Sequence, residues 1–227
     1  MLCIAEEAAR QWVADCSEQE RGLVPRCELE SWLRLVQEVA VLRLPLLFSR
    51  THADITLSEG GAVATRGGGG NWYRAAASKV AIRSGCHFAH VTAVEGVGLS
   101  FGVIRPGYDV EGGANAQHVD GHCFYWKGEG WRYPGDHDWE GRQEAWEPGN
   151  RIGMLLDVDQ GSMTVWKNTV KLGVMQAEGL SGLYCWAVEL IPADSERVES
   201  APAPASPTEE ELAAAKAWEP SSESDDE

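Results

Sequence analysis

The 227-residue chain lacks the features that would place it in or across a membrane. No apolar run reaches the roughly 18 residues that a membrane-spanning helix needs. The most apolar stretch, residues 39–48, is interrupted by Arg43 and Pro45. The first ten residues carry Glu6 and Glu7 and have no basic start, which is not the pattern of a secretory signal. We therefore expect no membrane span and no export signal.

Basic residues are also scarce. The chain has 19 Lys and Arg against 35 Asp and Glu, which gives a formal net charge of -16. Phosphate backbones and anionic membrane surfaces are bound by clustered Lys and Arg, so we expect neither nucleic acid nor a membrane as partner. Residues 193–227 hold eleven acidic and two basic residues, a net charge of -9.

None of the six cysteines forms a C-x-x-C pair, which argues against a RING or zinc-ribbon site. The cysteines are scattered, and the chain is long enough to fold without disulfide or metal cross-links. Such cysteines are typically reduced thiols, so we expect a cytoplasmic or nuclear protein. The G-x-S-x-G match at residues 98–102 falls inside a period-2 strand pattern and not on a strand-to-helix turn. The chain has no G-x-G-x-x-G loop in a βαβ context. These observations argue against a serine nucleophile and a dinucleotide cofactor.

Two weaker constellations of polar residues remain. A metal site could be drawn from His118, His122, Cys123, His137 and Asp138. A glycan hydrolase would need two facing carboxylates beside sugar-stacking aromatics, and the candidates are Asp136, Asp138, Glu140, Glu144 and Glu147 next to Trp139 and Trp146. Surface histidines and a solvated acidic loop are the more common outcome of such patterns. We expect no metal, no cofactor and no catalytic residue.

The first 50 residues read as a helical segment. One apolar stripe with helical spacing comprises Leu29, Trp32, Leu33, Val36 and Val39. A weaker stripe comprises Ile4, Ala8 and Trp12. We expect two helices that pack against each other or against the main domain, with a partner-docking helix as the alternative.

The last 35 residues have a different composition. Residues 201–207 alternate Ala and Pro in the manner of an extended linker. Thr208 and Glu211 have the spacing of a capping box, which predicts one short helix that runs to Trp218. Residues 221–227 form an acidic stub that we expect to be disordered.

Residues 51–192 show the period-2 patterns of many short strands. Inward-facing sets are predicted at Ile152, Met154 and Leu156, and at Tyr184, Trp186, Val188 and Leu190. Residues 157–161 and 128–130 have the composition of hairpin turns. We expect a mostly β domain, with Trp126, Trp166 and Trp186 in its core.

One part of this region resembles the SPRY domain. Residues 149–157 read GNRIGMLLD, residues 161–168 read GSMTVWKN, and Leu172-Gly173-Val174 follows. SPRY domains similarly show G-D-x-I-G-x-x-x-D, a short turn, a strand that ends in aromatic-x-N, and a further strand. Weaker likenesses occur at residues 85–91, 99–105, 124–126 and 182–190, so the resemblance covers about residues 53–192. The chain shows no clear PRY, RING, B-box or SOCS-box signature.

The resemblance implies a bent, concanavalin-like sandwich of two antiparallel sheets. It also implies a non-enzymatic module that binds a protein or peptide through loops at one end of the sandwich. Such a module would serve as an adaptor. Aromatic and Arg side chains on rigidly held loops are typical of binding hot spots. The candidate partner-binding residues are Asn71, Trp72, Tyr73, Arg105, Tyr108, Asp109, Trp131, Tyr133, Asp138 and Trp139. A carbohydrate-binding sandwich is the alternative function, and inward packing is the alternative for the loop aromatics.

Overall fold

The computed structural model describes residues 4–16, 21, 31–42, 46–67, 72–95, 98–112, 115–135, 138–142, 145–168, 170–191 and 196–200. Asn71, His137, the predicted helix at 208–218 and the acidic stub lie outside these residues. None of the helices described is both long and apolar enough to cross a membrane.

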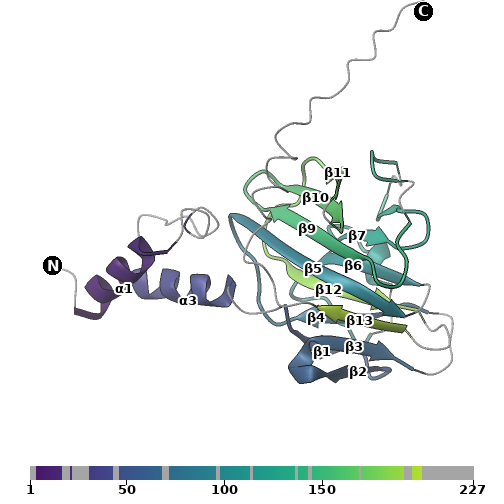
Figure 1. Ribbon diagram of the computed structural model, residues 1–227, viewed down its shortest axis with the longest axis horizontal. Coiled ribbons are helices and arrows are strands. Elements are labelled where there is room, and N and C mark those ends of the chain that lie inside the picture. The colour runs from purple at the N-terminus through teal and green to yellow at the C-terminus, as the bar shows by residue number, and fades with distance from the viewer. Residues whose placement is uncertain are drawn as a thin grey trace, which may run out of the picture.

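The described residues form two antiparallel sheets and a pair of helices (Figure 1). Sheet A contains, in spatial order, β1 (Phe48–Thr51), β4 (Arg74–Ser78), β12 (Cys185–Leu190), β6 (Leu99–Ile104), β7 (Cys123–Trp126) and β8 (Arg132–Tyr133). Sheet B contains β11 (Val170–Gln176), β10 (Ser162–Lys167), β9 (Arg151–Asp157), β5 (Cys86–Glu95), β13 (Glu196–Ser200), β3 (Val63–Arg66) and β2 (Ile55–Ser58). This confirms the expected mostly β, two-sheet sandwich.

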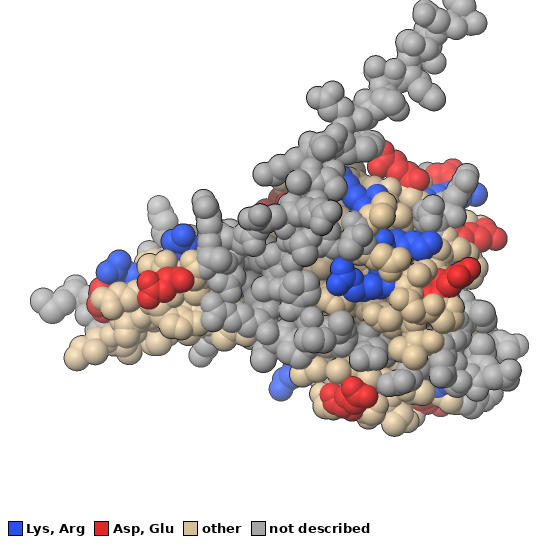
Figure 2. All heavy atoms as spheres, viewed as in Figure 1, with Lys and Arg blue, Asp and Glu red and all other residues tan. Residues whose placement is uncertain are grey.

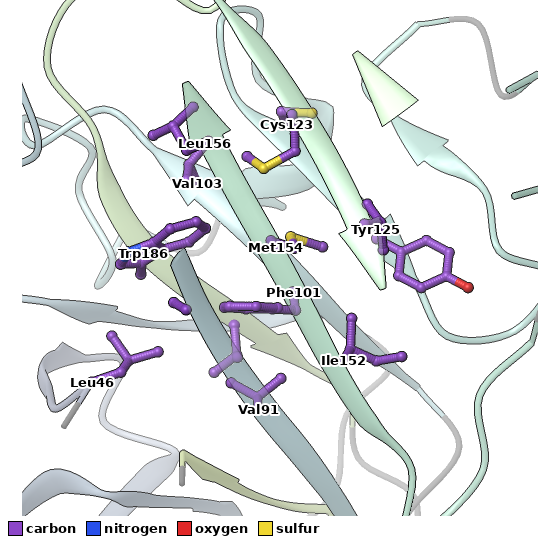
Figure 3. Close-up of a cluster of buried hydrophobic side chains, with 14 of the residues drawn as sticks. Leu46, Val91, Phe101, Val103, Cys123, Tyr125, Ile152, Met154, Leu156 and Trp186 are labelled. Carbon is purple, nitrogen blue, oxygen red and sulfur yellow. The ribbon is translucent and has the colours of Figure 1, made fainter. Parts of the chain in front are cut away.

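The main core lies between the two sheets and is built by period-2 alternation (Figure 3). Ile152, Met154 and Leu156 of β9 point into it, opposite Trp186 and Val188 of β12, and each is almost completely buried. Both predicted inward-facing sets are therefore confirmed. A smaller second cluster lies on the outer face of sheet A, where Phe124, Cys185 and Ala187 are buried.

The predicted burial of the tryptophans is correct for two of three. Trp186 lies between the sheets, and Trp166 is 1% exposed although it points to the outer side of sheet B. Trp126 is half-buried on the outer face of sheet A, because its strand neighbour Tyr125 points inward. Trp146, which comes from a segment outside the strands, is 1% exposed and stacks on Tyr125 inside the core.

Turn chemistry accounts for the two predicted hairpins. The Asp157 carboxylate accepts the backbone N–H groups of Asp159 (3.0 Å) and Gln160 (2.9 Å), and Gly161 supplies the positive φ that closes the turn between β9 and β10. Residues 127–130 form the turn between β7 and β8. Strand β13 lies beyond residue 192, in the segment whose composition predicts a linker and a tail.

The helices α1 (Ile4–Ala14) and α3 (Trp32–Leu42) pack on each other beside the sandwich (Figure 1). Their contact is formed by Val13, Cys16, Leu35 and Val39, with Cys86 of β5 at its edge. The predicted stripes are only partly correct. Ile4 is 92% exposed and Leu33 is 44% exposed, because the helices meet along the neighbouring residues Ala9, Val13, Leu35 and Val39.

Strands β6 and β7 approach so closely that there is no room for a side chain at Gly102. A Cβ atom on Gly102 would collide with the carbonyl oxygen of Cys123 and would lie 2.8 Å from the Cα of Phe124. We expect Gly102→Ala to lower the free energy of unfolding by about 1–3 kcal/mol, as overpacking does, in urea titration. Gly107→Ala is the control, since a Cβ there would have no atom within 4 Å. Equal stability of the two variants would contradict this packing.

Candidate binding surface

Aromatic side chains run along the outer face of sheet A from one end of the sandwich to the other. We call this set the aromatic belt. It comprises Tyr73, Tyr108, His118, His122, Phe124, Trp126, Trp131 and Tyr133. The belt exists because Phe124 and Trp126 alternate with the inward-facing Cys123 and Tyr125, so that both point away from the core.

One end of the belt is built around Trp126. Its indole N–H donates to the hydroxyl of Tyr73 at 2.7 Å. The ring of Trp131 lies 5.4 Å from that of Trp126, and the ring of Tyr133 lies 6.3 Å from that of Trp131. All four side chains are half-buried. Each therefore keeps its orientation through packing and still presents part of its surface to a ligand.

The other end is built by the segment that joins β6 to β7. The Tyr108 ring lies edge-on to His122 at 5.1 Å, and the exposed His118 lies edge-on to Tyr133 at 5.2 Å. The short helix η2 (Ala116–His118) carries this second contact. Burial raises the pKa of the Tyr108 hydroxyl to about 12, with smaller contributions from the negative charges of Glu189 and Asp109.

A buried carboxylate holds this segment on the sheet. Glu189 of β12 is 0% exposed and points to the outer face. It accepts the backbone N–H groups of Ala116 (2.5 Å) and Gln117 (2.9 Å) at the start of η2. The hydroxyl of Ser100 donates to the side-chain oxygen of Gln117 at 2.8 Å, also in a buried position. The strand therefore fixes the position of half the belt.

A pocket of about 370 Å³ adjoins Trp131. It is lined by Gly128, Glu129, Trp131, Arg142 and Ala145. Trp139 supports one wall, because its indole N–H donates to the Gly130 carbonyl at 2.6 Å and its ring stands edge-on to Tyr125. Asp138 forms an ion pair with Arg142 at the rim. The pocket thus joins an aromatic face to charges of both signs.

Two of the predicted site residues, Arg105 and Asp109, use their charged groups in contacts within the chain. The guanidinium of Arg105 donates to the carbonyl of Ser181 at 2.6 Å and lies 4.2 Å above the ring of Tyr184. The carboxylate of Asp109 accepts the N–H of Glu111 at 3.0 Å, which closes a local turn. Both residues shape the segment that carries Tyr108.

Trp72 is the most exposed aromatic residue in the described part of the chain, with 64% of its surface accessible. Its carbonyl accepts a hydrogen bond from Arg66, which is itself 1% exposed and also donates to the carbonyl of Leu190 at 2.5 Å. Trp72 precedes Tyr73 and therefore stands at the Trp126 end of the belt. A rigid backbone and an open side chain are the combination expected of an anchor residue.

The structure divides the predicted site residues between two places. Trp72, Tyr73, Trp131, Asp138 and Trp139 gather near the Trp126 end and its pocket. Arg105, Tyr108 and Asp109 lie at the opposite end of β6, and Tyr133 lies between the two groups. Sequence reasoning missed Trp126, His118, His122 and Phe124. The alternation of residues 123–126 could have placed Phe124 and Trp126 on one face.

Among the described residues, no group of three or more His, Cys, Asp or Glu side chains has the arrangement of a metal site, while Asp136, His137 and Glu144 lie outside them. The Nδ1 atom of His122 lies 2.8 Å from the Ala116 carbonyl oxygen, and Cys123 faces the core. Burial raises the pKa of the Cys123 thiol to about 12. Trp146 is buried and offers no face to a sugar. Cys16, Cys86, Cys123 and Cys185 are free thiols.

The burial of Glu189 makes stability depend on pH. Burial raises the pKa of this carboxyl from 4.5 to about 7, although the N–H groups of Gln117 and Ala116 favour the ionised form. The folded state therefore binds more protons than the unfolded state between about pH 4.5 and 7. This contribution to stability is complete below the unfolded pKa and is lost as pH rises through the folded pKa, a change on the order of 3 kcal/mol.

We expect Glu189→Gln to reduce the decline in the free energy of unfolding between pH 5 and pH 7.5. The variant is also expected to be less stable overall, because a neutral amide is a weaker acceptor for two backbone donors. Urea titrations at several pH values would measure both effects. A pH profile that runs parallel to that of the unmodified chain would show that Glu189 is ionised throughout.

Comparisons with known proteins agree with this architecture. No family model and no curated protein matches the chain. Solved structures do match, among them the SPRY domain of human HERC1, with a TM-score of 0.56, 19% identity, and coverage of 67% of this chain and 96% of that one. A second human SPRY domain gives a TM-score of 0.52 at 19% identity, and covers 68% of this chain and 98% of the other.

The TRIM65 PSpry domain gives a TM-score of 0.54 at 14% identity, and covers 78% of this chain and 99% of that domain. These identities are low, and the likeness lies in the fold. The β-sandwich of this chain has a SPRY-like fold.

Proposed function

We propose that the chain is a non-enzymatic interaction module that binds a peptide or a protein face through the aromatic belt on sheet A. The Trp126 end of the belt, with Trp72 and the pocket beside Trp131, forms the centre of the site. We also propose an adaptor role, because the proposed site would bind a partner and perform no chemistry on it.

The observation that carries the proposal is the combination of partial exposure with rigid support. Trp131 and Tyr133 are half-buried against neighbouring rings, and Trp126 is held by its hydrogen bond to Tyr73. Side chains fixed in this way lose little conformational entropy when a partner covers them. Tryptophan and tyrosine in such positions are the residue types that dominate binding free energies.

Charge and pocket chemistry restrict the partner. The pocket offers Glu129 and Arg142 beside the Trp131 ring, so a ligand residue with an apolar body and a polar end would fit it. The formal net charge of -16 favours a neutral or basic partner, because like charges repel during encounter. A short basic or neutral peptide with an aromatic or long aliphatic anchor is the expected ligand class.

The test is capture of partners by the full chain, followed by titration of the captured protein against variants. We expect Trp72→Ala with Trp131→Ala to weaken binding roughly 30-fold or more, since hot-spot truncations cost about 2 kcal/mol or more. Val170→Ala is the matched control. Val170 is an apolar residue, 63% exposed, on β11 at the edge of sheet B. Urea titration of each variant would verify that it remains folded.

A partner that binds all three proteins equally would contradict the proposed site. The single variant Trp72→Ala tests the site in a protein that should remain folded. The Trp72 side chain is largely exposed, and its removal leaves the backbone contact with Arg66 in place. Binding of a glycan array, lost in the same double variant, would assign the belt to carbohydrate recognition instead. Half-exposed tryptophans are the observation that favours this second function.

A further inference from the structure

The pocket beside Trp131 is preformed, because the parts of the chain around it are packed on each other. A Cβ atom on Gly130 would collide with the carbonyl oxygen of Arg142, so the two backbones are in close contact. The backbone N–H of Trp146 donates to the carbonyl of Lys127 at 3.2 Å. The turn between β7 and β8 is therefore fixed against both Arg142 and Trp146.

The other walls of the pocket are held in the same way. The ammonium group of Lys167, at the end of β10, donates to the carbonyl of Ala145 at 2.7 Å. The ring of Trp126 packs against Gly128, where a Cβ atom would have no room. A ligand group therefore meets walls that are already in place, and little ordering of the protein opposes its binding.

Glu129 is the charged residue of the pocket whose carboxylate is free. The other charged residue that lines the pocket, Arg142, is paired with Asp138. Glu129 is exposed, and its carboxylate forms no hydrogen bond or ion pair within the described part of the chain. Counted with the ion pair at its rim, the pocket therefore carries one uncompensated negative charge.

This charge lies beside the aromatic wall of the pocket. Burial raises the pKa of the Tyr133 hydroxyl, and the negative charge of Glu129 raises it further, which places the carboxylate near Tyr133 as well as near Trp131. The rings of Trp131 and Tyr133 are inclined at 50° and form a corner. The faces of aromatic rings attract cations, so the rings and the carboxylate favour a ligand of the same sign.

Local charges decide what the pocket binds. Acidic and basic side chains are interspersed over the described part of the face that Figure 2 turns to the viewer. Exposed charges that lie more than about 10 Å apart are largely screened from each other at 0.1 M salt. The charge of a bound group is therefore selected by the side chains that touch it, and in this pocket these include Glu129.

The chemistry of the pocket distinguishes between possible anchor residues of a peptide. A purely apolar side chain would remove water from Glu129 and give its carboxylate no partner, which is costly. An acidic side chain would be repelled by Glu129 and would compete with Asp138 for Arg142. An arginine side chain brings a planar cation that stacks on indole and has several N–H donors for a carboxylate. The volume of about 370 Å³ suits one long side chain.

We propose that this pocket takes an arginine side chain of the partner peptide. The guanidinium group stacks on the Trp131 ring and donates to the Glu129 carboxylate, while the aliphatic stem lies against Gly128 and Ala145. The proposal rests on the proposed function, because the pocket is part of that binding site, and it names the anchor residue that the site selects.

The test uses the ¹⁵N-labelled full chain, with Nα-acetyl-arginine methylamide as the probe. Each of the ten tryptophans gives one indole N–H signal, and single Trp→Phe variants assign those of Trp131 and Trp146. We expect the Trp131 signal to shift saturably, with a Kd on the order of 1 mM, and the signal of the buried Trp146 to stay in place. The citrulline analogue has nearly the same shape without the charge and should bind at least about tenfold more weakly.

A pair of variants tests the role of the carboxylate. Glu129→Gln should weaken binding of the arginine probe by about fivefold, the upper range for an exposed charge pair. Glu178→Gln is the matched control, because Glu178 is an exposed carboxylate outside the pocket, and it should leave the affinity unchanged. An unshifted Trp146 signal would verify that each variant keeps its core.

Three results would overturn the proposal. The first is a Trp131 signal that does not shift saturably with the arginine probe. The second is equal affinity for the arginine and citrulline probes, and the third is equal affinity of the two Glu→Gln variants. Tighter binding of Nα-acetyl-glutamate methylamide than of the arginine probe would assign the pocket to an anionic side chain instead.

The proposed function can fail or hold independently of this result. A captured partner that requires Trp72 and Trp131, while the arginine probe leaves Trp131 unshifted, would retain the interaction function and overturn only the arginine anchor. A probe that binds as expected, while every captured partner tolerates loss of both tryptophans, would contradict the proposed function and leave the pocket selective for arginine.

Discussion

The carboxylate of Glu189 joins the central strand of sheet A to the segment that crosses its outer face. Small side chains at Ala75, Ala77 and Ala187 leave room for that segment to lie flat, with Tyr108 and Ala116 against the sheet. Burial of a carboxyl without donors would cost several kcal/mol, and two backbone N–H groups compensate for it. The same two hydrogen bonds orient η2, and through it His118 and Tyr133. The shape of the aromatic belt therefore depends on one residue of β12.

The two faces of the sandwich are unequal in what they offer. Sheet A presents half-buried rings, a pocket and the exposed Trp72, whereas the outward aromatic residues of sheet B, Phe88 and Trp166, are almost completely shielded. A sandwich needs apolar residues only on its inner faces. Aromatic residues on both outer faces therefore reflect further contacts, and the difference in exposure separates a face that is open from one that is covered.

Local patterns in the sequence predict most of the fold. Alternation at residues 152–156 and 184–190 identifies inward-facing positions because one face of each strand meets the core. Strand β13 cannot be predicted in this way, because the sequence Glu-Arg-Val-Glu-Ser has almost no apolar pattern. The strand forms through its pairing with β3 and β5. The site is less predictable still. The contact of Trp126 with Tyr73 spans 53 residues of sequence, and no local pattern encodes it. Arg105 resembles a recognition residue in sequence, yet its guanidinium is used to hold residues 181–184.

The order of strands also determines when the domain can assemble during synthesis on the ribosome. Strand β12 lies between β4 and β6, and β13 lies between β3 and β5, so the last two of the described strands to emerge occupy interior positions of the two sheets. Until residues 185–200 leave the ribosome, each sheet exists as two separate pieces with unpaired edges. Such edges are templates for wrong pairings. The nascent chain consequently depends on residues 185–200 to close both sheets late in its synthesis.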